Sequence, residues 1–272
     1  MSLHVFSFGG GVQSTAALVL AASGEIDFTT FLFANVGDDS ENPATLEYVR
    51  TISMPYAEKH GLDLVELARM TREGATETLR EHLLRPGSRS VPIPVRMSVT
   101  GAPGTRQCTG VFKIDVLGRW MRHHGATKDD PATVGLGIST DEIQRAKPGI
   151  DPKAPYQLRT YPLLDLGLTR KDCYRIIADA GLPRPPKSSC YFCPFHAPIV
   201  WRDMARDEPE LFEKACALED LLNERRKMLG KDPVWLSRYL KPLRDSLRPT
   251  EDDLFGDVDH EIEECDEGVC FV

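Results

Sequence analysis

A run of three glycines lies directly after a short apolar segment near the start of this 272-residue chain. Residues 3–7 predict a buried strand, and an apolar helix is expected over about residues 14–22. Glycines at a strand-to-helix junction allow backbone N–H groups to converge on an anion beside the positive end of the helix dipole. The sequence therefore predicts a turn that either only connects the two elements or also binds a phosphate.

Strand-like and helix-like segments alternate after the glycine run. Residues 29–34, 63–67 and 133–138 predict further strands, and a helix is expected over residues 43–60. This alternation is typical of an α/β fold with a doubly wound, mostly parallel sheet that helices cover on both faces. Such sheets bind ligands beyond the carboxyl ends of their strands, where the glycine run and residues 35–39 are expected to lie.

Composition divides the chain into three predicted parts. Residues 1–182 form the α/β domain, residues 183–250 form a cysteine-bearing helical part, and residues 251–272 form an acidic tail. Residues 85–106, rich in Pro, Gly, Ser and Arg, predict a long loop inside the first part. The tail holds ten of the 41 Asp and Glu and no Lys or Arg. The rest of the chain therefore has 31 acidic and 33 basic residues, although the net charge of the whole chain is −8. Overall acidity therefore does not exclude an anionic ligand on the body of the protein.

The apolar segments and the cysteines indicate the compartment. No segment approaches the ~20 apolar residues that span a bilayer, and the N-terminus lacks the basic start of a signal peptide. We therefore expect a cytoplasmic protein with no membrane partner. Seven cysteines in such a chain favour metal or redox chemistry over disulfides. Cys173 and Cys216 lie in helical patterns and are expected to be packing residues.

Five motifs follow one another along the chain. They are FSFGGGVQST (6–15), FANVG (33–37), RQCT (106–109) with Lys113, GISTDE (137–142) with Arg145, and KSSCYFCP (187–194). In this order they resemble the motifs of the adenine nucleotide alpha hydrolase superfamily, the pyrophosphate-loop ATPases, and especially its phosphoadenosine phosphosulfate reductase-like members. The resemblance covers about residues 3–196 and implies the same α/β fold.

The resemblance also implies a site for ATP and Mg²⁺. The nucleotide-binding residues that it implies are Ser7, Gly9, Gly10, Gly11, Gln13, Ser14, Thr15, Asn35, Gly37 and Arg106. The catalytic residues that it implies are Lys113, Asp141 and Arg145. The usual loop reads Ser-Gly-Gly-x-Asp-Ser, so Gly9 replaces a serine and Gln13 replaces an aspartate. The missing carboxylate makes cleavage at the α-phosphorus less secure than nucleotide binding.

The Cys190-x-x-Cys193 pair suits an iron–sulfur cluster or zinc, because thiolates bind both. The resemblance implies that Cys108, Cys190 and Cys193 converge on a [4Fe–4S] cluster with one iron left open. A Cys₃His zinc site completed by His196 is an alternative, and the absence of any metal is a third reading.

The function expected from the resemblance is adenylation of a substrate by ATP, with release of pyrophosphate, followed by sulfur transfer. Sulfur would come from a donor protein or from sulfide, and the acceptor stays open among a tRNA, a DNA and a small metabolite. A sulfonucleotide (PAPS/APS) reductase is the first alternative, for which Glu264-Cys265 offers a weak C-terminal motif. A non-catalytic nucleotide-binding partner subunit is the second. Gly10→Val is expected to abolish ATP binding and leave the fold intact.

Overall fold

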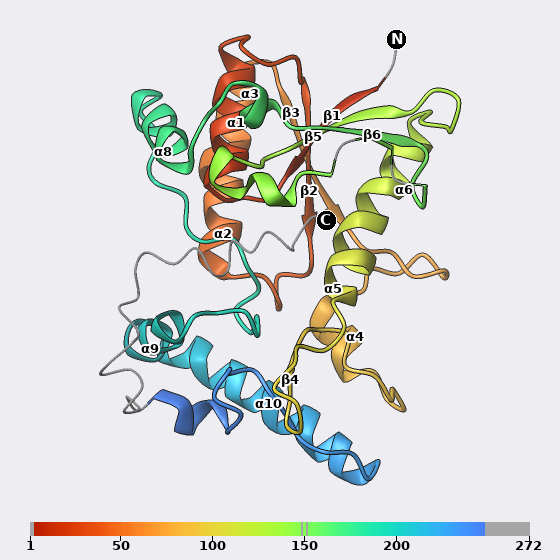
Figure 1. Cartoon of the computed structure of the whole chain (residues 1–272), viewed down its shortest axis with the longest axis vertical. Coiled ribbons are helices and arrows are strands. Elements are labelled where there is room, and N and C mark those ends of the chain that lie inside the picture. Colours follow the sequence, from red (N-terminus) through yellow and green to blue (C-terminus); the bar gives the residue numbers. More distant parts are fainter. Residues whose placement is uncertain (1–2, 148, 151, 248–272) are drawn as a thin grey trace. The chain divides into compact units, whose positions relative to one another are not determined.

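The computed structural model describes residues 3–147, 149–150 and 152–247, and the chain packs into two compact units (Figure 1). Unit 1 contains residues 3–78 and 109–189, and unit 2 contains residues 79–108 and 190–247, as far as these are described. The predicted boundary after residue 182 lies near the second change of unit. Composition did not indicate the first change, which assigns residues 79–108 to unit 2. The predicted acidic tail, with Cys265 and Cys270, lies outside the described residues.

Unit 1 is built on a five-stranded parallel sheet; the sequence predicted a mostly parallel sheet and four of these strands, but not the strand at residues 157–160. The strands are β1 (His4–Phe8), β2 (Thr30–Asn35), β3 (Asp63–Ala68), β5 (Ala132–Leu136) and β6 (Gln157–Thr160). Their order across the sheet is β3-β2-β1-β5-β6, and every neighbouring pair is parallel. The α/β fold class is therefore confirmed.

Helices cover both faces of this sheet because the side chains of each strand alternate between the faces. The helices of unit 1 are α1 (Val12–Ala22), α2 (Pro43–Tyr48), α3 (Met54–Lys59), α6 (Asp115–His123), α7 (Pro162–Asp165) and α8 (Arg170–Asp179). Figure 1 shows α1 and α8 on one side of the strands and α6 on the other. One face carries four phenylalanines of β1 and β2 whose rings contact one another in tilted and edge-to-face arrangements, namely Phe6, Phe8, Phe31 and Phe33.

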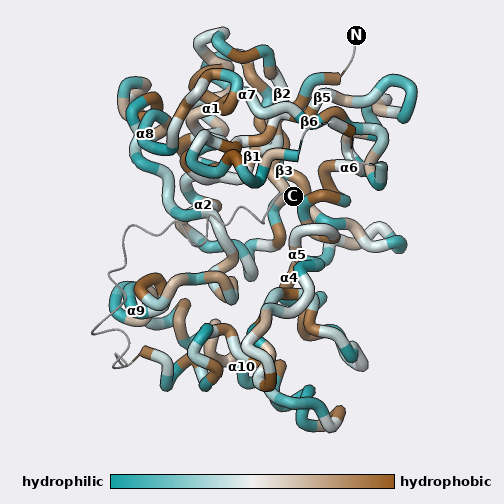
Figure 2. Tube along the Cα trace, viewed as in Figure 1, coloured by the Kyte–Doolittle hydropathy of each residue, from teal (hydrophilic) through white to brown (hydrophobic). Residues whose placement is uncertain are grey.

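The phenylalanines belong to a buried cluster with residues of α1 and α8, whereas Val5 and Leu32 pack on the opposite face with Met121 of α6. The ring centroids of Phe6 and Phe31 are 5.2 Å apart. Aromatic pairs at such separations add about 0.5–1.5 kcal/mol to the stabilisation from burial alone. Figure 2 shows the mainly hydrophobic character of α1 that this position requires.

The helix predicted over residues 43–60 is interrupted. A π-helical turn at Val49–Ser53 separates α2 from α3. Pro55 lies within the first turn of α3 and lacks the N–H that a continuous helix would use there. Unit 1 contains two further short helical segments, a π-helical turn at Gly110–Ile114 and a 3₁₀ helix at Thr140–Arg145.

The glycine turn between β1 and α1 is held tightly at Gly10. This residue has φ of +76°, and a Cβ atom built there would lie 3.0 Å from Thr45 Cγ2 and 3.1 Å from Val49 Cγ2. The backbone conformation and the lack of space both require glycine. These contacts argue against the expectation that Gly10→Val leaves the fold intact, because valine would strain the turn and press against Thr45 of α2 and against Val49.

We expect Gly10→Ala to lower the free energy of unfolding by about 2–5 kcal/mol, since left-handed strain costs roughly 1–2 and overpacking roughly 1–3. Gly24→Ala is the matched control, because Gly24 has φ of +78° with nothing within 4 Å of an added Cβ. Urea unfolding followed by circular dichroism measures both. Equal losses in the two variants would contradict the tight contact at Gly10.

Unit 2 is mainly helical, with one short ladder. Its helices are α4 (Leu79–Leu84), α9 (Pro198–Asp207) and α10 (Pro209–Met228), followed by a 3₁₀ helix at Leu243–Leu247. The short helix α5 (Gln107–Thr109) lies where the chain returns to unit 1. Strand β4 (Arg96–Met97) pairs antiparallel with β7 (Val234–Trp235). None of the described helices combines the length and the apolar character that a bilayer crossing requires.

A buried carboxyl organises the end of unit 2. Glu219 of α10 is only 3% exposed and accepts hydrogen bonds from the N–H groups of Leu236 at 2.7 Å and Leu243 at 2.8 Å. Burial raises the pKa of this carboxyl from 4.5 to about 7, although the two backbone donors favour its ionised form. Glu219 thus fixes the segment after β7 and titrates near neutral pH.

Because the folded pKa of Glu219 exceeds its unfolded value, its contribution is complete below pH 4.5 and is lost as pH rises to about 7. We expect the loss to approach about 3 kcal/mol, from ~1.4 kcal/mol per pKa unit. Glu219→Gln removes this titration, so the free energy of unfolding of the wild type should fall relative to that of the variant from pH 5 to pH 8. Thermal unfolding across pH measures it, with the exposed Glu224→Gln as control. A difference independent of pH would contradict the assignment.

Candidate functional site

The glycine turn lies at the topological switch point of the sheet. The chain passes from β1 to β2 and β3 on one side, and it then returns to β5 on the other side of β1. The carboxyl ends of β1 and β5 are therefore neighbours from which the following segments diverge. Crevices of this kind are where open α/β sheets bind their ligands.

The first turn of α1 faces this switch point with its backbone donors. The N-cap is Gly11, and no side chain caps the helix there. The hydroxyls of Ser14 and Thr15 instead donate to the Gly11 carbonyl at 3.0 and 2.9 Å. Both side chains are buried, so in this structure the backbone N–H groups, not these predicted hydroxyls, are the donors suited to an anion.

Two other segments of unit 1 pack against the turn. The Ser188 hydroxyl donates to the Gly9 carbonyl, and the Thr45 hydroxyl donates to the Lys187 carbonyl at 3.4 Å. On the side of β5, a Cβ at Gly137 would lie 3.3 Å from the Cβ of Gln13. The sequence motifs at residues 6–15, 137–142 and 187–189 are therefore assembled around one turn.

A buried carboxylate lies beside Gln13. The Nε2 of Gln13 donates to Oε2 of Glu142 at 3.5 Å, and Arg145 forms an ion pair with the same oxygen. Glu142 is 6% exposed, and its Oε1 has no hydrogen-bond partner among the described residues. Burial raises the pKa of Glu142, and the adjacent Arg145 partly offsets this rise. The sequence placed Glu142 in a motif but did not select it as a site residue.

The predicted catalytic residues have different surroundings. Asp141 accepts a hydrogen bond from the N–H of Arg170 at 2.5 Å and one from the Ser139 hydroxyl at 3.4 Å, so it anchors the start of α8. Arg145 is engaged with Glu142, and Lys113 is buried in the π-helical turn before α6. All three belong to unit 1, and Arg145 contacts Glu142, which in turn contacts Gln13 beside the glycine turn.

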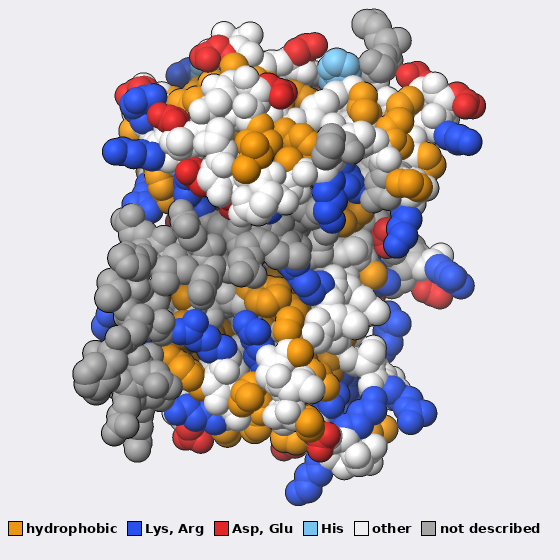
Figure 3. All heavy atoms as spheres, viewed as in Figure 1, with side chains coloured by type: hydrophobic (Ala, Val, Ile, Leu, Met, Phe, Trp, Pro, Cys, Tyr) orange, Lys and Arg blue, Asp and Glu red, His pale blue; other side chains and the backbone are white. Residues whose placement is uncertain are grey.

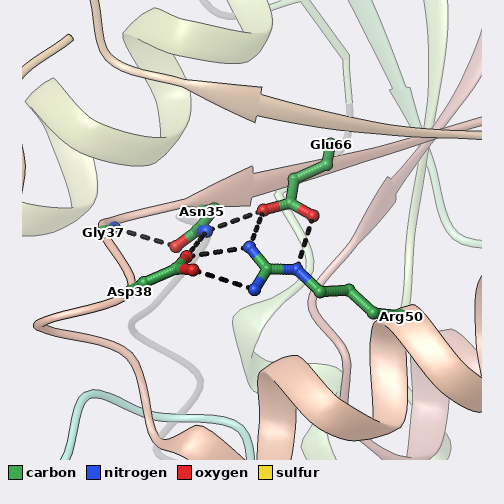
Figure 4. A network of polar contacts seen from close by, with 5 residues as sticks. All are labelled: Asn35, Gly37, Asp38, Arg50 and Glu66. Carbon is green, nitrogen blue, oxygen red and sulfur yellow. Dashed lines mark hydrogen bonds and ion pairs between the residues drawn. The ribbon is translucent and has the colours of Figure 1, made fainter.

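The end of β2 carries a polar network (Figure 4). The Asn35 amide donates to Asp38 and to Glu66, both at 2.7 Å, and its oxygen accepts from the Gly37 N–H at 2.8 Å. Arg50 bonds both carboxylates through its guanidinium and holds their pKa values below the usual range. The predicted nucleotide-binding residue Asn35 thus uses its side chain to fix the turn, and Gly37 supplies a backbone conformation with φ of +119°.

The three predicted metal ligands belong to unit 2. Cys190 and Cys193 lie in one turn, where the Cys193 N–H donates to the Cys190 carbonyl at 3.1 Å. A ring nitrogen of His196 lies 3.0 Å from the same carbonyl, and the Cys108 N–H donates to Pro92 at 2.9 Å. Within the part of the chain that the structure describes, no three His, Cys, Asp or Glu side chains form a group able to hold a metal ion.

The shared metal centre therefore stays a prediction. Arg106, predicted to bind the nucleotide, also lies in unit 2, whereas the glycine turn lies in unit 1. Cys173 and Cys216 are buried packing residues, and burial raises the pKa of each thiol to about 12.

No protein-family model and no curated protein matches this chain. Among solved structures, one that is similar is the U34-tRNA thiolase NcsA from Methanococcus maripaludis with its [4Fe-4S] cluster. The identity is 12% and the TM-score is 0.43, over 81% of this chain and 72% of that one. The chain's own features are a glycine turn at the switch point of a parallel sheet, and a second unit that carries Cys108, Cys190 and Cys193.

Proposed function

We propose that this chain binds ATP at residues 9–15 and transfers adenylate to an acceptor, which prepares the acceptor for sulfur transfer. The observation that carries the proposal is the uncapped start of α1 at the switch point of the sheet. Its N–H groups and the helix dipole favour a phosphate chain there. The motif order along residues 3–196 supports an adenine nucleotide over other phosphates.

Glu142 is the residue that fits the Mg²⁺ ion accompanying ATP. Its buried Oε1 has no hydrogen-bond partner among the described residues, and Gln13 links the carboxylate to the glycine turn. Mg²⁺ is commonly bound by one or two carboxylates together with substrate phosphates and water. Glu142 would thereby supply the carboxylate that the loop lacks at position 13.

The chemistry follows from this placement. An acceptor oxygen attacks the α-phosphorus, pyrophosphate leaves, and the adenylated oxygen becomes a leaving group. A sulfur nucleophile then forms the new bond to the acceptor as AMP departs. The chain contributes position and charge neutralisation through the α1 N–H groups and Arg145.

We also propose that Cys108, Cys190 and Cys193 serve the sulfur half of the reaction. Their presence in one unit and their thiolate chemistry suit a [4Fe–4S] cluster, which supplies an iron site for sulfur when it is bound. The side chains do not form a ligand group as described, so binding would require them to move together.

Gln13 favours a second candidate, a sulfonucleotide reductase. Its amide, where the resembling loops have a carboxylate, suits a reaction in which the α-phosphorus is not cleaved. The reductase would release sulfite from an adenosine phosphosulfate.

Gly11→Asp tests nucleotide binding without disturbing the fold. Gly11 has φ of −101°, and an added Cβ would lie 3.7 Å from Ser188 Cβ, an ordinary contact. Aspartate is a preferred N-cap, so stability should be kept or improved. Its charge would compete with phosphate, and we expect ATP affinity by calorimetry to fall about 100-fold, from the ~2–3 kcal/mol of charge-assisted hydrogen bonds.

Gly11→Asn is the matched control, because it has the same shape and capping ability without the charge. It should weaken ATP binding less than Gly11→Asp does. Unchanged ATP affinity in a folded Gly11→Asp protein would show that ATP does not bind at the start of α1.

Product assays on anaerobically purified protein separate the two candidates. We expect pyrophosphate release from ATP when the acceptor is present, and no sulfite release from adenosine phosphosulfates with thioredoxin. A visible spectrum with iron and sulfide counts should show a cluster that Cys193→Ser diminishes and that Cys216→Ser, a buried packing position, retains. Sulfite without pyrophosphate would favour the reductase, and a colourless, iron-free protein would remove the cluster.

A further inference from the structure

Unit 2 is more basic than unit 1. Residues 79–108 and 190–247 contain fifteen Lys and Arg against eleven Asp and Glu, whereas residues 3–78 and 109–189 contain seventeen against twenty. Within unit 2 the segment 79–108 is the extreme, with five arginines and one glutamate. Figure 3 shows Lys and Arg side chains gathered on the visible face of unit 2.

Two of these arginines share one aromatic ring. The guanidinium carbon of Arg106 lies 5.0 Å from the centroid of Phe195, and that of Arg96 lies 5.6 Å from it. Arg96 belongs to β4, and Phe195 follows the Cys190–Cys193 turn. Stacking on a ring fixes the plane of a guanidinium and lowers the entropy that it loses when it binds a ligand.

Among the described residues, no acidic side chain forms an ion pair with either guanidinium. The Nε of Arg96 and the Nε of Arg106 are buried and lack a hydrogen-bond partner in the described chain, and neither arginine forms an ion pair there. By contrast, Arg206 pairs with Asp203 and Asp207 in the same unit. Two fixed positive charges beside one ring, with donors unused, form a site that an anion would stabilise. The planar fork of each arginine suits phosphate oxygens.

A second cluster of the same kind belongs to the same unit. The Nζ of Lys241 lies 5.6 Å from the ring centroid of Tyr239, and the guanidinium carbon of Arg238 lies 5.7 Å from it. This ring comes four residues after Trp235, which pairs with Arg96 in the β4–β7 ladder. One such cluster is enough to bind a single phosphate group, so two clusters suit a ligand that carries several phosphates in a chain.

The backbone at the second cluster is strained. Leu240, between Tyr239 and Lys241, has φ of +55°, and no other non-glycine residue in the described ranges has a positive φ. Such a conformation costs about 1–3 kcal/mol and is retained mainly where function requires it. The Leu240 side chain lies beside Gly101, where an added Cβ would be 3.6 Å from Leu240 Cδ1.

We propose that unit 2 binds the phosphodiester backbone of a nucleic acid, with Arg96 and Arg106 on Phe195 as its central phosphate contact and the Tyr239 cluster extending it. Contacts with phosphate groups do not read the bases, so these clusters would give affinity without selecting a base sequence. The inference deepens the proposed function, on which it rests only for the role of the bound nucleic acid as sulfur acceptor.

Fluorescence anisotropy with labelled 20-nucleotide single strands of RNA and of DNA tests this on the full chain over a salt series. We expect Arg96→Gln combined with Arg106→Gln to weaken binding at least about tenfold. The slope of log affinity against log salt should fall by about 1.4, since each phosphate contact to a single strand contributes ~0.7. The RNA and DNA arms identify the preferred sugar, and either preference supports the proposal.

The matched control is Arg206→Gln combined with Arg244→Gln, which removes the same charge from unit 2 at exposed arginines paired with acids. Its affinity should change less than twofold. Equal weakening in the two double variants would reduce the site to general charge and overturn the proposal. Inorganic phosphate at about 10 mM is added as a competitor, at matched ionic strength so that charge screening stays the same. Displacement of the oligonucleotide by this phosphate would point to a small phosphorylated ligand instead and overturn the proposal.

Photocrosslinking keeps the test independent of variant folding. A 4-thiouridine oligonucleotide on the wild-type chain should crosslink within residues 96–106, 190–196 and 238–241. Crosslinks confined to unit 1 would overturn the proposal. Because these measurements omit ATP, nucleic-acid binding without ATP binding would refute the proposed function and leave this inference standing.

Discussion

The close contact of the glycine turn with Thr45 of α2 and with Val49 determines the edge of unit 1 at the switch point of the sheet. Thr45 and Val49 occupy the space that a side chain at Gly10 would need, so the backbone itself forms the surface there. Ser188, 179 positions further along the chain, donates to the Gly9 carbonyl from another direction. The turn is thus fixed by packing and by hydrogen bonding before any ligand arrives. Preformed backbone donors of this kind lose little freedom on binding.

Unit 2 achieves order by different means, because its segment 79–108 contains little regular structure. Arg225 of α10 donates to the Leu83 carbonyl at 2.5 Å and to the Ser90 carbonyl at 3.1 Å, and Lys231 donates to Arg89 at 2.7 Å. Backbone carbonyls that would lack partners in a loop are therefore satisfied by cationic side chains. The long predicted loop is attached to a helix more than a hundred residues away.

The alternation of strand-like and helix-like segments was sufficient to predict the parallel sheet, because short apolar segments such as residues 3–7 and 29–34 are each followed by a helical one. The glycine turn was predicted from three consecutive glycines between a strand and a helix. The network of Asn35, Arg50 and Glu66 did not, since sequence patterns do not pair side chains on separate elements. The assignment of residues 79–108 to unit 2 was equally hidden, because composition does not reveal which distant helix a loop packs against. Glu142 was within a recognised motif, but its burial beside Gln13 required the tertiary structure.

The strand order has a consequence for synthesis on the ribosome. The central strand β1 pairs on one side with β2 and on the other with β5, with His4 opposite Thr133. One edge of β1 therefore stays open while more than a hundred further residues are made, and residues 79–108 await partners beyond residue 190. Pairings between distant segments form slowly and leave strand edges exposed to other chains. We therefore expect a nascent chain of this topology to depend on chaperones until its second half has left the ribosome.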